Sequence, residues 1–189
     1  MAQGKKYNRA DYVKAALTVI AREGAEKLSM RKVASQLNVS AMAMYKHFSN
    51  KDELVSACLD AFIAESSVYP ENEDISWQDW VRHTADRMFT ALCGEISWLP
   101  VFGSIKRGPL AKEVLAHFIA KLTVSDFSEQ QATDGYFAII HTVIGAASIQ
   151  NSLDRITAEE DSEKVASHRD QFMKSINMII NALEEHQKN

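Results

Sequence analysis

Apolar residues recur every three or four positions along most of the chain, which is the period of an amphipathic α-helix. Only three prolines interrupt the pattern, and no run of any length alternates apolar and polar residues as a β-strand does. The pattern therefore predicts an all-α protein. Helices are expected at about residues 9–23, 30–37, 40–47, 50–65, 77–93, 110–122, 129–153 and 165–183.

Small residues mark where several of these helices begin and end. Ser29, Ser40 and Ser49 precede three of them and are expected to be N-caps, because a serine hydroxyl can accept a backbone N–H that the first helical turn leaves unpaired. Gly24 is expected to stop the first helix. The helix at 129–153 is apolar nearly all round its middle, which predicts burial on several sides.

The stretch 28–51 contains two short helical patterns separated by Asn38-Val39-Ser40. A helix pair this short, joined by so tight a turn, can lay its second helix in the major groove of DNA. Met44 and Phe48 are four residues apart and are expected to anchor that helix to a core. Its opposite side presents side chains that can touch a thymine methyl, a guanine edge or a phosphate. These are Met42, Ala43, Tyr45 and Lys46.

The charge distribution supports a DNA contact near the N-terminus. The chain has a formal net charge of −4, but residues 1–51 carry ten Lys and Arg against three acidic residues, a net +7. The remaining residues carry eleven against twenty-two, a net −11. A basic module on an acidic body suits a protein that meets phosphate on one face. The alternative is chance clustering of solvated charge.

Other classes of function have little support. The sequence has no glycine-rich phosphate loop, nucleophile elbow or paired-cysteine metal site, so no enzyme activity, cofactor or metal is expected. Asp79, His83 and Asp86 have helical spacing, but a solvated face explains them better than a metal cluster. The longest apolar-rich run, 136–149, is shorter than the roughly 20 residues of a membrane span. With only two cysteines and a polar, basic start, a cytoplasmic protein is expected.

The same residues carry a family resemblance. Residues 9–60 resemble the N-terminal DNA-binding domain of the TetR family of transcriptional regulators, through Leu28-Ser29-Met30-Arg31-Lys32-Val33-Ala34, the turn at 38–40, Tyr45-Lys46-His47-Phe48 and Lys51-Asp52-Glu53-Leu54. The resemblance implies about nine helices, with a three-helix DNA-binding domain at 1–51 and a helical effector-binding and dimerisation domain at 52–189.

By this resemblance, Tyr45, His47 and Lys51 would contact the DNA backbone, Arg31 would reach a base or phosphate, and positions 41–43 would face bases. Ala41, Met42 and Ala43 have no hydrogen-bonding side chains, so DNA shape would carry more of the specificity. Packing within the helices is the alternative for Tyr45 and His47. The residues expected at the DNA are Ser29, Met30, Arg31, Ser40, Ala41, Met42, Ala43, Tyr45, Lys46, His47 and Lys51.

The resemblance also implies a homodimer formed through the last two helices and a ligand pocket in the middle helices. The dimer residues are expected to be Ile144, Ala147, Ser148, Phe172, Ile176, Ile179 and Leu183, and the alternative is that both helices complete a monomeric core. The pocket is expected to take a small hydrophobic or aromatic effector, although core packing is the alternative for each lining residue. Its candidates are Phe62, Phe89, Cys93, Trp98, Phe102, Phe118, Phe137 and His141.

The sequence thus predicts a ligand-responsive repressor that binds a pseudo-palindromic operator in double-stranded DNA as a dimer. Two alternatives stay open. One is a DNA-binding regulator, or a nucleoid or division factor, that no small molecule controls. The other is an enzyme or carrier that resembles the family by chance.

Overall fold

The computed structural model describes residues 6–70, 74–94, 98, 108–156 and 162–187, and the described residues form helices and turns without a strand. The chain divides into two compact units. Unit 1 comprises Met1–Glu65 and Glu95–Pro109, and unit 2 comprises Ser66–Gly94 and Leu110–Asn189. The all-α prediction is confirmed. No helix in the described part of the chain is long and apolar enough to cross a membrane.

Unit 1 begins with α1 (Arg9–Glu23), whose bounds agree with the predicted helix. Asn8 and Asp11 form a capping box, in which each side chain accepts the backbone N–H of the other residue. Gly24 follows the helix at φ 90°, a conformation that glycine adopts without steric strain because it has no Cβ. Its N–H donates to the Ile20 carbonyl at 2.8 Å. A 3-10 helix, η1 (Ala25–Lys27), then leads into the next α-helix.

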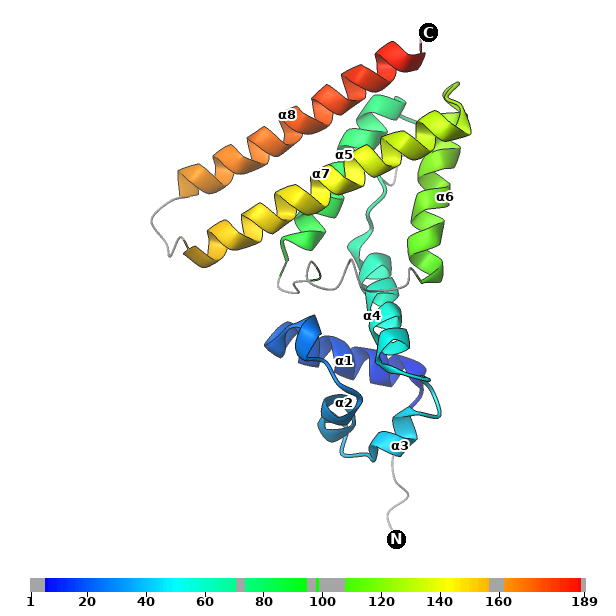
Figure 1. Cartoon of the computed structure of the whole chain (residues 1–189), viewed down its shortest axis with the longest axis vertical. Helices are drawn as coiled ribbons and strands as arrows, with labels where there is room; N and C mark the ends of the chain where they lie inside the picture. The colour runs from blue at the N-terminus through cyan, green and yellow to red at the C-terminus, as the bar shows by residue number, and fades with distance from the viewer. Residues whose placement is uncertain (1–5, 71–73, 95–97, 99–107, 157–161, 188–189) are drawn as a thin grey trace. The chain divides into compact units, whose positions relative to one another are not determined.

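The helix-turn-helix consists of α2 (Met30–Gln36) and α3 (Ala41–Met44) (Figure 1). Ser29 caps α2 as predicted, because its hydroxyl accepts the Lys32 N–H at 3.3 Å. Asn38 ends α2 in the left-handed region at φ 54°. The N–H of Asn38 donates to Ser35 and that of Val39 to Ala34, which is the hydrogen-bond pattern of a Schellman motif.

The predicted helix at 40–47 is too long. The α-helix ends at Met44, and residues 45–47 form a turn in which the His47 N–H donates to the Met44 carbonyl at 2.8 Å. Such bonds to the third residue back tighten the end of a helix. Ser40 stands at the N-cap position of α3 as predicted, but its side chain does not make the expected capping hydrogen bond.

The next helix, α4 (Lys51–Ser66), is capped by Asn50 and not by Ser49. The Asn50 side chain accepts the Glu53 N–H at 2.9 Å, while Ser49 donates its own N–H to the Glu53 carboxylate at 2.7 Å. Asparagine is as good an N-cap as serine, so the sequence pattern alone does not choose between neighbours. The core beneath these helices consists of buried apolar side chains, among them Ala16, Val19, Ile20, Val33, Met44, Phe48 and Leu54.

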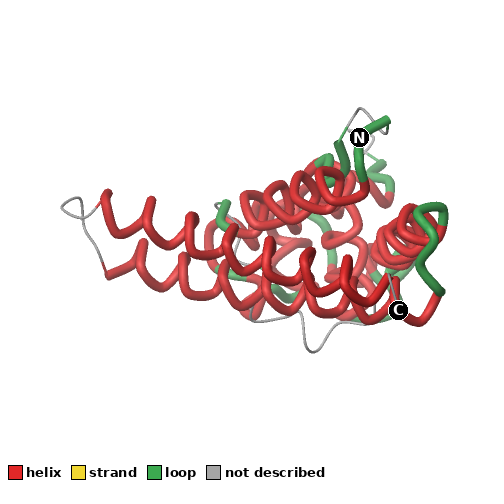
Figure 2. The backbone as a smooth tube through the Cα atoms, turned by 90° about the horizontal axis from the view of Figure 1, so that it is seen from above, coloured by secondary structure: helices red, strands yellow, loops and turns green. Residues whose placement is uncertain are grey.

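Unit 2 contains α5 (Trp77–Leu92), α6 (from Pro109, the last residue of unit 1, to Thr123), α7 (Glu129–Ile156) and α8 (Ser162–Gln187). Figures 1 and 2 both show α7 and α8 side by side along most of their length, and α5 packs against both. The shared core includes Val81, Phe89, Ile139, Val143, Phe172, Ile176 and Ile180.

Burial of α7 differs from the prediction. His141, Gly145 and Ser148 lie exposed along the helix, and Ile149 is 53% exposed. The expectation of burial on several sides is therefore wrong for the single chain. The pattern of apolar residues cannot tell whether the chain itself or a second molecule covers a helix face.

The left-handed Asn38 generates a stability prediction. Asn38→Ala should lower the free energy of unfolding by about 1 kcal/mol, because alanine has no side-chain hydrogen bond to offset its cost in this region. Asn38→Gly is the matched control and should be nearly neutral, since glycine adopts the conformation freely. Chemical denaturation of both variants measures the difference. Equal stability of the two would contradict the assignment of the turn.

Candidate nucleic-acid interface

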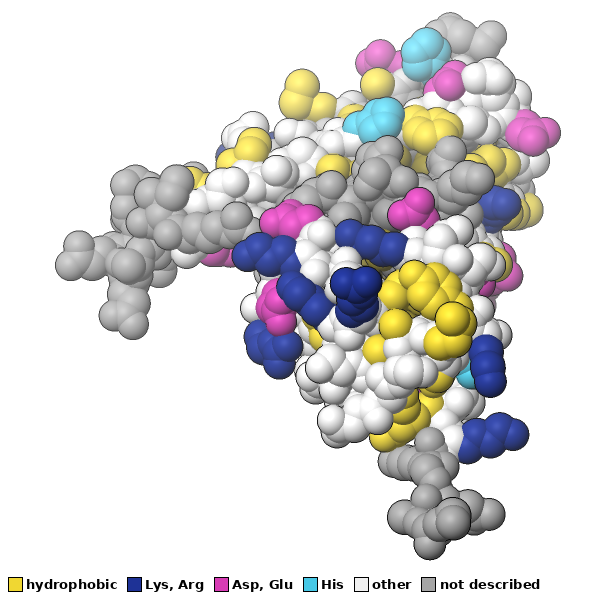
Figure 3. Space-filling view, turned by 60° about the horizontal axis from the view of Figure 1, so that its bottom comes forward, with side chains coloured by type: hydrophobic (Ala, Val, Ile, Leu, Met, Phe, Trp, Pro, Cys, Tyr) yellow, Lys and Arg dark blue, Asp and Glu magenta, His cyan; other side chains and the backbone are white. Residues whose placement is uncertain are grey.

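The second helix of the helix-turn-helix exposes one side to solvent. Met42 is 71% exposed and Tyr45 is 52% exposed, while Met44 between them is fully buried. Lys46 and Arg31 are also exposed. Lys and Arg side chains gather around exposed hydrophobic ones on the face that Figure 3 brings forward. This combination of cationic and apolar groups suits phosphates and thymine methyls.

The other predicted DNA residues are less exposed. Ala41 and Ala43 are half-buried, and Ser40 is exposed beside them. Met30 is 6% exposed, so its side chain belongs to the core, and only its backbone is left for a contact with DNA. The Ser29 hydroxyl caps α2 by accepting the Lys32 N–H.

His47 and Lys51 are both held by contacts within unit 1. The His47 ring packs on the buried Tyr12 ring with centroids 5.1 Å apart. The Lys51 ammonium donates to the Glu26 carbonyl at 3.0 Å, which ties the start of α4 to η1. The alternative stated for His47, packing within the helices, is therefore observed for its ring, which stays half-buried.

Acidic neighbours divide the cations of this region into two groups. Lys32 pairs with Glu23 at 2.6 Å, and together with Arg22 it lowers the pKa of the Glu23 carboxyl to about 2. Within the described residues, Arg31 and Lys46 form no ion pair. Their charge is therefore less compensated than that of Lys32.

Arg9 and Glu53 form a contact that the sequence pattern does not predict. Arg9 pairs with Glu53 at 2.9 Å and lies over the Phe48 ring, 4.1 Å from its centroid. Hydrogen bonds from the Ser49 N–H and, with a smaller effect, from Arg9 hold the pKa of the Glu53 carboxyl below its ordinary value. The residues are 44 positions apart, so no local pattern connects them.

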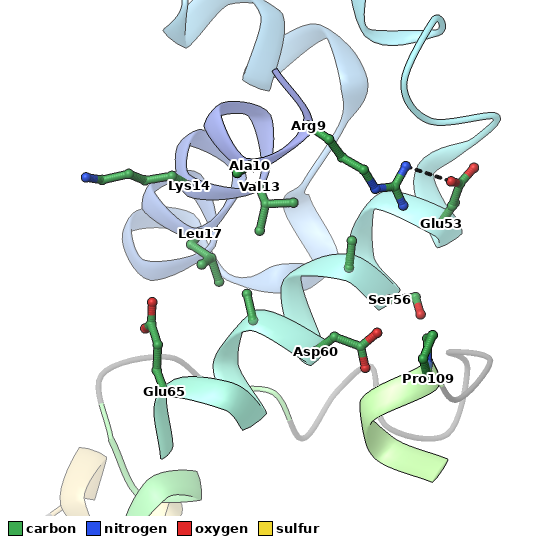
Figure 4. Close-up of a pocket in the computed structure, with 12 residues that line it drawn as sticks. Arg9, Ala10, Val13, Lys14, Leu17, Glu53, Ser56, Asp60, Glu65 and Pro109 are labelled. Carbon is green, nitrogen blue, oxygen red and sulfur yellow. Dashed lines mark hydrogen bonds and ion pairs between the residues drawn. The ribbon is translucent and has the colours of Figure 1, made fainter. Parts of the chain in front are cut away.

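A groove of about 830 Å³ lies between α1 and α4 in unit 1 (Figure 4). Ala10, Val13, Leu17, Ala57 and Ala61 form much of its wall, with charged side chains around them. None of the predicted effector residues that the structure describes lines this groove.

The predicted effector residues form separate aromatic groups. Phe62 and Trp98 contact each other in unit 1, with centroids 5.3 Å apart. In unit 2, Phe118 contacts Trp80, and Phe89 stacks on Phe172 at 4.5 Å. The remaining candidates have other positions. Phe137 is half-buried beside the exposed His141, Cys93 is half-buried, and Phe102 lies outside the described residues. The pocket stays a prediction.

Two buried polar groups lie close to the aromatic core of unit 2. Trp80 and Thr84 are both fully buried and stand one turn apart on α5. The indole N–H of Trp80 and the hydroxyl of Thr84 have no hydrogen-bond partner among the described residues. Buried polar groups are rarely left unpaired, so this pair calls for an explanation.

The predicted dimer residues fall into two sets. Ala147, Phe172, Ile176 and Leu183 are buried within unit 2, whereas Ile144 and Ile179 are half-buried and Ser148 is exposed. Only the second set offers surface to another molecule. The same helices also expose Ile149 and Met178, the latter by 70%.

Asp79 and Asp86, which have the helical spacing of a metal cluster, bind neighbouring side chains, and the Cys93 thiol is unreactive. Asp79 accepts hydrogen bonds from Ser76 and Arg82, and Asp86 pairs with Arg169 at 2.6 Å. Burial raises the pKa of the Cys93 thiol to about 11, with a smaller contribution from Asp154. The thiol is therefore protonated at neutral pH and is a poor nucleophile.

Comparisons with known proteins identify the N-terminal domain. Residues 13–58 match the family described as bacterial regulatory proteins, tetR family. An HTH-type transcriptional regulator from Saccharopolyspora erythraea is 28% identical over 74% of this chain and 59% of its own length. The tetracycline repressor protein class A from transposon 1721 of Escherichia coli is 26% identical over 71% of this chain and 62% of its own length. The aligned part of the chain thus spans about three fifths of these two relatives.

The fold matches solved structures over nearly the whole chain. A TetR variant from Acinetobacter baumannii AYE, solved in complex with minocycline, superposes with a TM-score of 0.81 at 23% identity, covering 96% of this chain and 99% of that one. The helix-turn-helix domain therefore belongs to the TetR family of bacterial regulatory proteins, and the chain as a whole has the all-α fold of the solved TetR protein.

Proposed function

We propose that this protein is a transcriptional repressor that binds a pseudo-palindromic operator as a homodimer and leaves it when a small hydrophobic or aromatic effector binds. The observation that carries DNA binding is the exposed surface of α3 and the turn after it, where Met42, Tyr45 and Lys46 are exposed while Met44 is buried. Such a regulator acts in the cytoplasm, where it meets the chromosome.

Base recognition by this surface is mainly apolar. Met42 can contact a thymine methyl, and Lys46 or Arg31 can reach guanine or phosphate. Ala41 and Ala43 add only small van der Waals contacts, so sequence-dependent DNA shape supplies part of the specificity. A mobility-shift assay on DNA upstream of its own and neighbouring genes tests the proposal directly. If the protein shifts none of these fragments in preference to unrelated DNA, operator binding is contradicted.

The phosphate-facing residues generate a prediction for DNA affinity. The double variant Tyr45→Ala with Lys51→Ala should bind the shifted fragment about tenfold or more weakly. The slope of log affinity against log salt concentration should become shallower by about one, because one phosphate contact is lost. Fluorescence anisotropy at several salt concentrations measures both quantities. Lys112→Ala, an exposed lysine on α6 of unit 2, is the matched control and should bind like the wild type. Unchanged affinity and salt slope in the double variant would refute the assignment of this surface.

The exposed apolar residues of α7 and α8 support the dimer. Ile144 and Ile149 on α7, with Met178 and Ile179 on α8, leave apolar surface. The small Gly145 and Ser148 lie beside it and allow a close approach of helices. A two-fold dimer places two recognition helices about one turn of DNA apart, or a multiple of that.

Charge on this surface should separate the protomers. Met178→Glu is expected to shift the protein to a monomer in sedimentation velocity at micromolar concentration, because a carboxylate is costly to bury in an apolar interface. Val124→Glu changes an even more exposed apolar residue, 86% accessible, between α6 and α7, and it should leave the dimer intact. A dimeric Met178→Glu protein would place the interface elsewhere.

The unpaired Trp80 N–H and Thr84 hydroxyl support an effector in unit 2. They would supply hydrogen-bond donors to a largely aromatic ligand, as polar groups do in apolar pockets. The family relatives named above include a tetracycline repressor and a TetR–minocycline complex, so tetracyclines are the first probes. Release of DNA by a ligand separates the proposed repressor from a regulator that no small molecule controls.

Thr84→Val tests this role with opposite signs in two measurements. The melting temperature without ligand should stay the same or rise, because an unpaired buried hydroxyl is removed. The melting-temperature increase caused by a binding ligand should shrink, because its partner is lost. Thr18→Val, which changes an exposed threonine on α1, should leave the ligand response unaltered. A full ligand response in Thr84→Val would exclude this hydroxyl from the site.

A further inference from the structure

Arg9, the first residue of α1, reaches across unit 1 to the turn that follows α3. One of its guanidinium nitrogens donates to the His47 carbonyl and to the Glu53 carboxylate, the latter at 2.9 Å. The same guanidinium lies over the Phe48 ring, 4.1 Å from its centroid. Arg9 therefore holds two consecutive residues of the turn and the first turn of α4 at once.

Glu53 continues these contacts on the other side. Its second carboxylate oxygen accepts the Ser49 N–H at 2.7 Å, and its own backbone N–H donates to the Asn50 side chain at 2.9 Å. Figure 4 shows Arg9 on α1 and Glu53 on α4 joined across the end of the groove between these helices. Arg9 and Glu53 thus bond the backbone of His47 and Ser49, and Glu53 also bonds the Asn50 side chain.

An isolated ion pair of this exposure would contribute little to stability, because water and salt screen it. The Arg9 contacts differ from such a pair in two respects. The guanidinium also stacks on an aromatic face and binds a backbone carbonyl, which fixes its orientation. The segment that it holds lies between Tyr45 and Lys51, the residues proposed to meet phosphate.

We propose that Arg9 and Glu53 are positioning residues for DNA binding, which hold the segment 47–50 so that Tyr45, His47 and Lys51 face the phosphate backbone together. This inference rests on the proposed function. Tyr12 assists from the same helix, because the His47 ring packs on it. Arg9 thereby sets the backbone of a residue whose ring Tyr12 already orients.

Simple electrostatics predicts the opposite behaviour for one of the two residues. If Arg9 merely attracted DNA, Glu53 would weaken that attraction, and Glu53→Gln would increase affinity by removing a negative charge. If the pair holds the turn, Glu53→Gln decreases affinity, since a neutral amide binds the guanidinium and the Ser49 N–H less strongly than a carboxylate. The sign of the change separates the two explanations.

The DNA experiment uses the duplex that the wild type retains in the mobility-shift assay. Arg9→Lys and Glu53→Gln should each weaken binding about five- to tenfold, although the first keeps the charge and the second makes the protein less negative. Arg22→Lys is the matched control, because Arg22 lies on the same helix and pairs only with its neighbour Glu23 among the described residues. It should bind like the wild type.

A tighter-binding Glu53→Gln variant, or an Arg9→Lys variant with wild-type affinity, would overturn the positioning role. Melting temperatures of all variants identify any that lose affinity through unfolding. A variant that binds weakly while melting within a few degrees of the wild type supports positioning.

Hydrogen exchange tests the turn without DNA and therefore keeps the inference separate from the proposed function. In the full-length protein, Arg9→Lys and Glu53→Gln should speed amide exchange in residues 47–53 severalfold, while exchange in α2 stays as in the wild type and in Arg22→Lys. Unchanged exchange in 47–53 would overturn the inference even if DNA binding were lost. If the wild type retains no DNA, the proposed function fails, and the exchange result still decides whether this pair holds the turn.

Discussion

The helix-turn-helix of this protein depends on burying a few apolar side chains beneath very short helices. α2 has seven residues and α3 has four, whereas an isolated helix needs about 12–15 residues to be even marginally stable in water. Packing of Val33, Met44 and Phe48 in the core of unit 1 supplies what the helices lack. Each buried side chain of this size contributes about 1.5–3 kcal/mol. Because Met44 points inward, Met42 and Tyr45 on either side point out.

Polar contacts then set the path of the backbone between the buried anchors. Asn38 adopts the left-handed conformation that reverses the chain after α2, and Asn50 starts α4. Arg9 and Glu53 join the first turns of α1 and α4 beside the segment between Met44 and α4. The exposed surface proposed to bind DNA is therefore shaped by residues that need not touch it.

Unit 2 differs from unit 1 in keeping exposed apolar side chains on its surface and unpaired hydrogen-bond donors in its interior. Apolar residues such as Ile149 and Met178 remain exposed on α7 and α8, while Trp80 and Thr84 are buried with unpaired donors. A partner protomer would cover the first kind of group, and a ligand would satisfy the second. Both features fit the proposed ligand-responsive dimer.

The sequence by itself determined the all-α fold, the bounds of α1, the Ser29 cap and the position of the helix-turn-helix, because these follow from local periodicity and capping chemistry. It also located the exposed residues of α3, since Met44 and Phe48 fix the buried side. Only the tertiary structure decided that Met30, Phe172 and Ile176 are core residues, that Asn50 rather than Ser49 caps α4, and that Arg9 meets Glu53. These outcomes depend on which side chains contact each other in the folded chain, often between residues tens of positions apart in sequence. A local pattern of apolar and polar positions contains no information about such long-range contacts.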